Sequence, residues 1–272
     1  CFAHERFCRS LSPVESRNAM SGSRLRGLMW GVIPAAGLGS RMVDHHVDGC
    51  KEVIEIHGRT MLQRTIDELR AADVDGIVIV TSPQKPALRE RLEESGQLER
   101  GDIEFVEQMS PLGLVHALEL ARSVCGDEML TAAPDNLYVG HPCPAIELLK
   151  VFDRGDCAVI GVVQVVLPWG SLLSDVGRID ALYDSPHNAL RMVSGIMGKR
   201  KNSPFPIRDP PHWRCTGRMV LTSEFWDVRA ESDVEKLDIL AARGQLAAAP
   251  INAAYVDVGI PMGLVFALQQ LN

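Results

Sequence analysis

Apolar runs and amphipathic stretches alternate along most of the chain. Short apolar or β-branched runs predict buried strands, whereas apolar residues at i, i+3 and i+4 predict helices. In the first half, strands are expected at residues 28–36, 76–81, 102–108 and 128–135. Helices are expected at residues 61–72, 86–95 and 111–125. This alternation indicates βαβ units and a mostly parallel, Rossmann-like sheet with helices on both faces.

The second half of the chain has a different pattern, with more and shorter β-branched stretches. Strands are expected at residues 158–166, 176–182, 189–197, 215–221 and 253–259. Helices are expected at residues 233–243 and from Pro261 onwards. The proline-rich stretch 203–213 should be a loop. The short strands predict a small β-rich lobe over the open side of the sheet.

Composition narrows the class of protein. The chain has 272 residues, a net charge of −7 and 46% hydrophobic residues, which suits one globular domain with a substantial core. No apolar run approaches the roughly 20 residues of a membrane span. The mild acidity argues against a nucleic-acid binder. The seven cysteines show no CxxC pairing, so reduced thiols and a cytoplasmic location are expected.

The first 28 residues differ from the rest, because five arginines stand among serines with little apolar periodicity. We expect residues 1–28 to be a disordered or non-native extension. The folded domain is then expected to span residues 29–272.

A glycine-containing loop follows the first strand. Gly37 and Gly39 would let the backbone approach a ligand and point its N–H groups at it. Arg41 closes the loop, and its planar guanidinium suits phosphate oxygens; Lys51 follows ten residues later. These features predict a triphosphate-binding loop. An ordinary tight turn is the alternative, because neither the GxGxxG nor the P-loop pattern is complete.

Two more strand ends carry candidate chemistry, since open α/β sheets bind ligands at the carboxyl ends of their strands. The amide of Gln108 could pair with a nucleobase edge, and Gly113 could let the next helix start pack against the flat base. Taken alone, these two residues are better interpreted as an ordinary surface glutamine and a helix-start glycine. Asp135 is well placed to hold Mg²⁺ on a phosphate, although a helix-capping or turn-capping role is about as common.

The motif AAGLGSRM, with Lys51-Glu52 after it, resembles the signature of the sugar-1-phosphate nucleotidyltransferases. It is similar in particular to that of UTP–glucose-1-phosphate uridylyltransferases. Further motifs follow in the family's order, and the resemblance covers about residues 30–272. They are QMSPLGLVHA from Gln108, PDN from Pro134, SDVGRID from Ser174, IMGKR from Ile196, TGRMVL from Thr216 and DVGIP from Asp257.

The resemblance implies a nucleotide-diphospho-sugar transferase fold, with a nucleotide half at about 29–155 and a sugar-binding half at about 156–272. It implies transfer of a nucleoside monophosphate from an NTP, expected to be UTP, to a sugar-1-phosphate, expected to be glucose-1-phosphate. It also implies a homo-oligomer. The residues that it implies for nucleotide binding are Ala35, Ala36, Gly37, Gly39, Ser40, Gln108, Pro111 and Gly113.

For the remaining roles the resemblance implies fewer residues. Arg41, Lys51 and Lys199 would contact the reacting phosphates. Gly177, Thr216 and again Lys199 would bind the sugar, with Lys199 on its phosphate. Asp135 and Asp257 would hold Mg²⁺.

Three departures from the family pattern leave alternatives open. Cys50 replaces a proline before the lysine, Gly198 replaces a glutamate that holds sugar hydroxyls, and Arg200 replaces a proline. One alternative is a transferase for another sugar or another NTP, namely dTTP, CTP or GTP. The other is a catalytically weak nucleotide-binding regulator.

Overall fold

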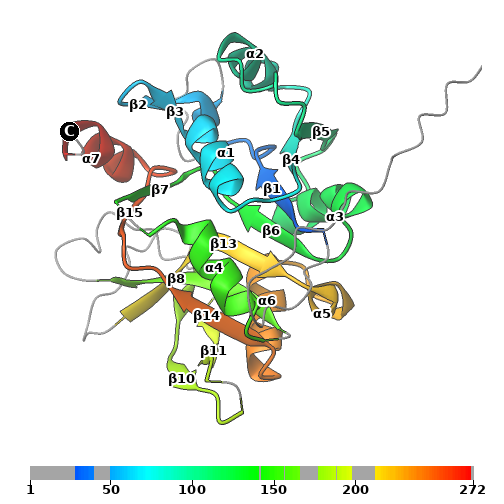
Figure 1. Cartoon of the computed structure of the whole chain (residues 1–272), viewed down its shortest axis with the longest axis vertical. Helices are drawn as coiled ribbons and strands as arrows, with labels where there is room; N and C mark the ends of the chain where they lie inside the picture. Colours follow the sequence, from blue (N-terminus) through cyan, green and yellow to red (C-terminus); the bar gives the residue numbers. More distant parts are fainter. Residues whose placement is uncertain are drawn as a thin grey trace, which may run out of the picture.

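The computed structural model describes residues 28–39, 50–140, 142–155, 157–165, 177–187, 189–197 and 212–270. Within them, one eleven-stranded mixed sheet runs through the molecule (Figure 1). Four parallel strands form one side of it: β1 (Trp30–Pro34), β4 (Gly76–Thr81), β5 (Ile103–Glu107) and β6 (Met129–Ala132). β1 pairs with β4 on one side and with β6 on the other, so the strand order reverses beside β1.

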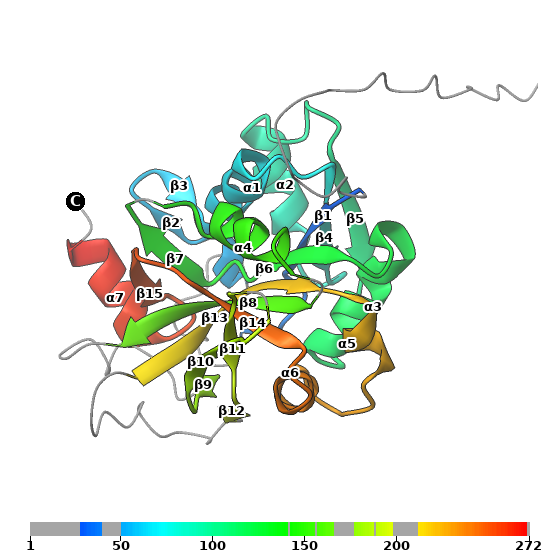
Figure 2. The ribbon, with the colours of Figure 1, turned by 60° about the horizontal axis from the view of Figure 1, so that its bottom comes forward.

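The other side of the sheet mixes directions. β13 (His212–Leu221) runs antiparallel between β6 and β8 (Ala158–Val165), and β14 (Leu246–Pro250) continues parallel to β8. Four short strands join this side of the sheet rather than forming a separate lobe: two extend its edge beyond β14, and the other two pair with each other and join through β13 (Figure 2). They are β9 (Arg178–Ile179), β10 (Leu182–Asp184), β11 (Arg191–Val193) and β12 (Ile196–Met197). The expected β-rich region is therefore continuous with the central sheet.

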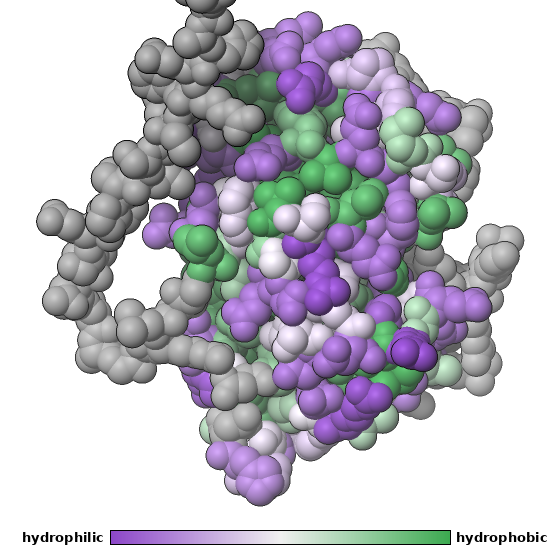
Figure 3. Space-filling view, turned by 90° about the vertical axis from the view of Figure 1, so that its right-hand side faces the viewer, coloured by the Kyte–Doolittle hydropathy of each residue, from purple (hydrophilic) through white to green (hydrophobic). Residues whose placement is uncertain are grey.

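Helices cover both faces of the sheet because each strand presents apolar side chains alternately to either side. One core lies under α1 (Met61–Ala71), α2 (Ala87–Glu94) and α4 (Pro144–Phe152). The second lies under α3 (Leu114–Cys125), α5 (Ser223–Asp227) and α6 (Asp233–Ala242). On the outer face around α3 and α5, hydrophilic side chains predominate, with smaller apolar patches between them (Figure 3). The expected α/β class is confirmed.

A third, smaller core lies beside the main sheet. It is built from the hairpin β2 (Glu55–Ile56) and β3 (Arg59–Thr60), the antiparallel pair β7 (Asn136–Val139) and β15 (Ala254–Asp257), and α7 (Pro261–Gln270). The strand expected at 253–259 thus pairs with β7 and not with the main sheet. This pairing brings the end of β15 to the start of β7, directly after β6.

Several elements differ from the sequence expectations. α4, β7 and β14 were not expected, and β13 begins at His212, inside the stretch expected to be a loop. The expectation for residues 1–28 lies almost entirely outside the described residues. In the part of the chain that the structure describes, no helix has the length and apolar character needed to cross a bilayer.

A buried arginine ties α1 to the sheet. Arg218 of β13 is 1% exposed and binds both carboxylate oxygens of Glu68 at 2.9 and 2.8 Å. Its remaining N–H groups donate to the carbonyls of Ala133 at 2.6 Å and Asn136 at 3.3 Å. Arg218 therefore also holds the backbone on both sides of Asp135.

Arg218→Met should lower the free energy of unfolding by about 3–5 kcal/mol, because it leaves Glu68 buried without its partner. The control is Arg191→Met, which removes a pair whose arginine side chain is 51% exposed and whose Asp184 is 83% exposed. Its cost should be about 1 kcal/mol or less. Urea unfolding followed by tryptophan fluorescence measures both. Equal losses in the two variants would contradict this account of Arg218.

Candidate functional site

The candidate site lies where the strand order reverses between β1 and β6. In open α/β sheets, the loops that leave neighbouring strands in opposite directions create a crevice at this point. A pocket of about 380 Å³ opens there. Its lining includes Pro34 at the end of β1, Gly113 at the start of α3, Asp135 after β6 and Asp257 at the end of β15. The strand ends that the sequence pointed to thus meet at one cavity.

Two carboxylates converge in this pocket. The N–H of Val258 donates to the carbonyl of Asp135 at 3.0 Å, which joins the two loops that carry them. A Cβ atom placed on Gly259 would lie 2.7 Å from Oδ2 of Asp135 and 3.1 Å from Oδ1 of Asp257. Both carboxylates therefore face the same small volume. Only glycine leaves that volume open.

Each carboxylate has its own cation. Nζ of Lys51 lies 2.5 Å from Oδ2 of Asp135, and Nη2 of Arg214 lies 2.8 Å from Oδ2 of Asp257. Lys51 reaches Asp135 from the short 3₁₀ helix η2 (Lys51–Val53). Arg214 reaches Asp257 from β13 and is 4% exposed. Two ion pairs, Lys51–Asp135 and Arg214–Asp257, thus meet at the pocket.

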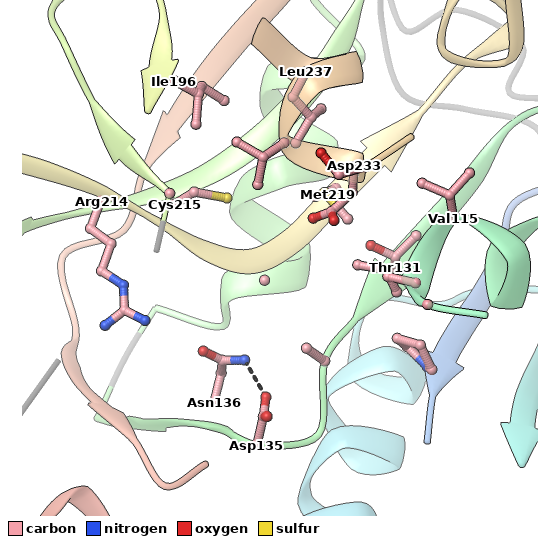
Figure 4. A pocket seen from close by; sticks show the side chains of 18 of the residues that line it. Val115, Thr131, Asp135, Asn136, Ile196, Arg214, Cys215, Met219, Asp233 and Leu237 are labelled. Atoms are coloured by element: carbon pink, nitrogen blue, oxygen red, sulfur yellow. Dashed lines mark hydrogen bonds between the residues drawn. The ribbon is translucent and has the colours of Figure 1, made fainter. Parts of the chain in front are cut away.

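Hydrogen bonds orient the carboxylates further. Nδ2 of Asn136 donates to Oδ1 of Asp135 at 2.8 Å, and the N–H of Gly259 donates to Oδ1 of Asp257 at 3.1 Å. The Tyr255 hydroxyl bonds in turn with the side-chain oxygen of Asn136. Burial raises the pKa of Tyr255 well above its usual value, so the phenol remains a hydrogen-bond donor. Figure 4 shows Arg214 and the Asp135–Asn136 pair on one side of the pocket, with Asp233 of α6 on the other.

The glycine loop begins at the edge of this pocket. Ala35 and Ala36 are buried, and the N–H of Ala35 donates to the carbonyl of Val80 at 2.8 Å. Gly37 is exposed and its Cα faces open space. Gly39 is partly exposed. Two residues expected in this loop, Ser40 and Arg41, lie outside the described residues.

The segment expected to contact the base is folded around the start of α3. Gln108 is 4% exposed, and its Nε2 donates to the carbonyl of Gly113 at 3.1 Å and to Nδ1 of His116 at 2.9 Å. Its amide nitrogen therefore supports the helix start. Gly113 has φ +94°, which favours glycine, and it lines the pocket with free space above its Cα. Pro111 lies on the exposed turn before it.

The residues expected to bind the sugar differ in whether they line the pocket. Gly177 lines the pocket, and its carbonyl accepts the N–H of Cys215 at 2.8 Å. Thr216 is fully buried, and its hydroxyl donates to the carbonyl of Gly161 at 3.0 Å. Arg214, Cys215 and Gly217 of β13 line the pocket, and Thr216 is not among the lining residues. That Thr216 contacts the sugar stays a prediction. Lys199 lies outside the described residues.

Sequence reasoning missed several pocket residues. Arg214 and Asn136 are the clearest, and Glu231 and Asp233 line the pocket from the beginning of α6. The sequence offered one signal for Arg214, which stands directly before the strand expected at 215–221. An arginine buried in a strand requires an acidic partner. The sequence does not say which carboxylate that partner is.

The described residues contain no group of three or more His, Cys, Asp or Glu side chains arranged to hold a metal ion. Asp135 and Asp257 supply two converging carboxylates instead. This donor set fits Mg²⁺, which commonly binds one or two carboxylates and takes its other ligands from water and substrate phosphates. Asp135 and Asp257 could therefore hold Mg²⁺ together with a phosphate-bearing ligand.

The chain is similar to known proteins in sequence and in fold. Residues 31–164 match the MobA-like NTP transferase domain. The chain is 28% identical over 218 residues to the UTP–glucose-1-phosphate uridylyltransferase YngB of Bacillus subtilis, covering 72% of this chain and 70% of that protein. It is 28% identical over 271 residues to UTP–glucose-1-phosphate uridylyltransferase 2 of Staphylococcus saprophyticus, covering 89% of this chain and 91% of that protein.

The fold is also similar to a solved structure, a UTP-bound UDP-glucose pyrophosphorylase from Acinetobacter baumannii. The TM-score is 0.70 at 21% identity, covering 90% of this chain and 93% of the other. The resemblance seen in the sequence motifs is confirmed. Residues 31–164 therefore carry a MobA-like NTP transferase domain, and the chain is similar over most of its length to UTP–glucose-1-phosphate uridylyltransferases.

Proposed function

We propose that this chain transfers UMP from UTP to glucose-1-phosphate, with UDP-glucose and pyrophosphate as products. The observation that carries the proposal is the convergence of Asp135 and Asp257, with Lys51 beside them, at the point where the strand order reverses. The choice of UTP and glucose-1-phosphate is supported by the relatives in Bacillus subtilis and Staphylococcus saprophyticus, which are UTP–glucose-1-phosphate uridylyltransferases.

The reaction is a displacement at phosphorus. A phosphate oxygen of the sugar-1-phosphate forms a bond to the α-phosphorus of UTP while the bond from that phosphorus to the α,β-bridging oxygen breaks. Pyrophosphate leaves with the bonding electrons. Both reactants are anions, so catalysis comes chiefly from positioning and from neutralising charge.

Each cationic side chain would contact a different phosphate group. Lys51, held at Asp135, would contact the triphosphate as it enters above the carboxylates. Arg41 would take the leaving pyrophosphate, and Lys199 would hold the attacking sugar phosphate. Backbone N–H groups at Gly37 and Gly39 would cradle the phosphates, as glycine-rich loops do.

Magnesium would be held by Asp135 and Asp257, and it would supply charge neutralisation where the two substrates meet. Asn136 binds Oδ1 of Asp135, and the Gly259 N–H binds Oδ1 of Asp257. The carboxylates therefore need little reorganisation when a nucleotide arrives. A homo-oligomeric state and the cytoplasmic location stay predictions.

Purified protein should release pyrophosphate with UTP and glucose-1-phosphate in the presence of Mg²⁺. The measurement is a coupled pyrophosphate assay across UTP, dTTP, CTP and GTP, with several sugar-1-phosphates. Faster release with another pair would reassign the substrates within the same reaction class. If no pair gives pyrophosphate while calorimetry detects UTP binding, the chain is a nucleotide-binding regulator and the proposed reaction is wrong.

Asp135→Asn should lower kcat by about 100-fold or more, because one of two carboxylates that neutralise charge through Mg²⁺ is lost. Asp184→Asn is the matched control, since that carboxylate is 83% exposed on β10, outside the pocket. It should retain wild-type kinetics. Circular dichroism verifies that both variants are folded. Wild-type turnover in Asp135→Asn would remove Asp135 from the proposed site.

A further inference from the structure

A buried lysine outside the pocket joins the two sides of the glycine loop. Lys85 lies between β4 and α2, and its side chain is 4% exposed. Its Nζ donates to the carbonyl of Ala35 at 2.7 Å and to Oε2 of Glu52 at 2.8 Å. The Glu52 side chain is 1% exposed, so this ion pair is almost completely removed from water.

The two contacts of Lys85 fall at the boundaries of the proposed triphosphate grip. Ala35 directly follows Pro34, the last residue of β1, and lies two positions before Gly37. Glu52 follows Lys51 directly within η2. One ammonium group therefore links the start of the loop to the short helix that presents Lys51 to Asp135. The segment between the two anchors spans sixteen intervening positions in the sequence, from 36 to 51.

A third side chain completes this cluster. The Cys50 thiol donates to the same Glu52 oxygen at 3.0 Å. Burial, followed by the nearby Glu52 charge, raises the pKa of Cys50 to about 12, so the thiol stays protonated as a donor. Cys50 stands where the family pattern has a proline, which has no side-chain donor. In this chain the thiol gives Glu52 a second hydrogen bond.

Stability alone does not account for such a pair. Burying an ammonium and a carboxylate costs free energy that their attraction only partly offsets, and apolar side chains of similar volume often serve as well. What an apolar pair cannot do is hold a carbonyl oxygen at hydrogen-bond distance. The Ala35 carbonyl is held in that way, at the position where the backbone leaves the sheet.

We propose that Lys85 is a positioning residue for nucleotide binding. With Glu52 it forms a charged clamp that sets the spacing between the glycine loop and Lys51. Lys85 is not among the residues that line the proposed substrate pocket. It therefore acts through its contacts with Ala35 and with Glu52 of η2. The kinetic effect of this clamp rests on the proposed function. Loss of the clamp should weaken the binding of UTP more than that of the sugar-1-phosphate.

The decisive variant replaces both charges, Lys85→Met with Glu52→Gln. Removing both avoids an uncompensated buried charge, so its unfolding midpoint should be higher than that of Lys85→Met alone. The KM for UTP should nevertheless rise about 10-fold, while the KM for the sugar-1-phosphate changes by less than about 2-fold. Lys150→Met is the control, because Lys150 is 64% exposed in a surface pair with Glu147. It should change neither constant.

Amide hydrogen exchange gives a readout that needs no turnover. In the double variant, residues 35–39 and 50–53 should exchange faster than in the wild type, while β8 exchanges at the same rate. The UTP dissociation constant from calorimetry should rise along with the KM. If the wild type transfers no nucleotide with any substrate pair, the proposed function fails, and the exchange and binding data still test the clamp.

Unchanged UTP binding together with unchanged exchange in the double variant would overturn the proposal. Glu52→Gln alone is a second test, since it leaves Lys85 an acceptor oxygen but removes the negative charge. It should raise the UTP dissociation constant about 3-fold, and wild-type affinity in this variant would equally overturn the clamp.

Discussion

Buried charges must be paired, and this requirement governs how the loops around the pocket are arranged. Removing an ion from water costs several kcal/mol unless a partner and hydrogen bonds compensate. The described part of the chain meets this cost with pairs that join elements far apart in sequence. The pairs are Lys85–Glu52, Lys51–Asp135, Arg214–Asp257 and Arg218–Glu68. Each one fixes a loop or short element at the carboxyl edge of the parallel strands.

The pairs also act together through the backbone. Arg218 binds the carbonyls of Ala133 and Asn136, so it holds the segment on which Asp135 lies. From the same strand, Arg214 fixes Asp257. One strand, β13, thus positions both carboxylates of the proposed site. Such preorganisation is what a charge-neutralising active site needs, because its groups are already aimed before the substrates arrive.

Local patterns in the sequence predicted much of the fold, and long-range pairing explains what they missed. Buried strands such as β4 and helices with a clear apolar face such as α1 were predictable because their signals are continuous. Asp135 and Asp257 were identified as strand-end carboxylates. Their convergence depends on the β7–β15 pair, whose partners are more than a hundred residues apart and too short to predict.

The direction in which side chains point was the second feature that the sequence did not predict. Thr216 lies within a register irregularity between Cys215 and Met219, next to Gly217 at φ +65°. A glycine inside a strand pattern can indicate such a bulge, but it does not say which neighbouring side chain faces the pocket. The sequence offered no signal for the role of Lys85, because its partners Ala35 and Glu52 come from earlier segments of the chain.

A crystal structure with Mg²⁺ and a non-hydrolysable UTP analogue tests the central claim most directly. The account predicts one metal ion with an oxygen of Asp135 and an oxygen of Asp257 each at about 2.0–2.1 Å. The triphosphate should lie against Gly37–Gly39 with Lys51 in contact. A metal ion bound without either carboxylate, or a nucleotide seated away from the end of β1, would contradict it.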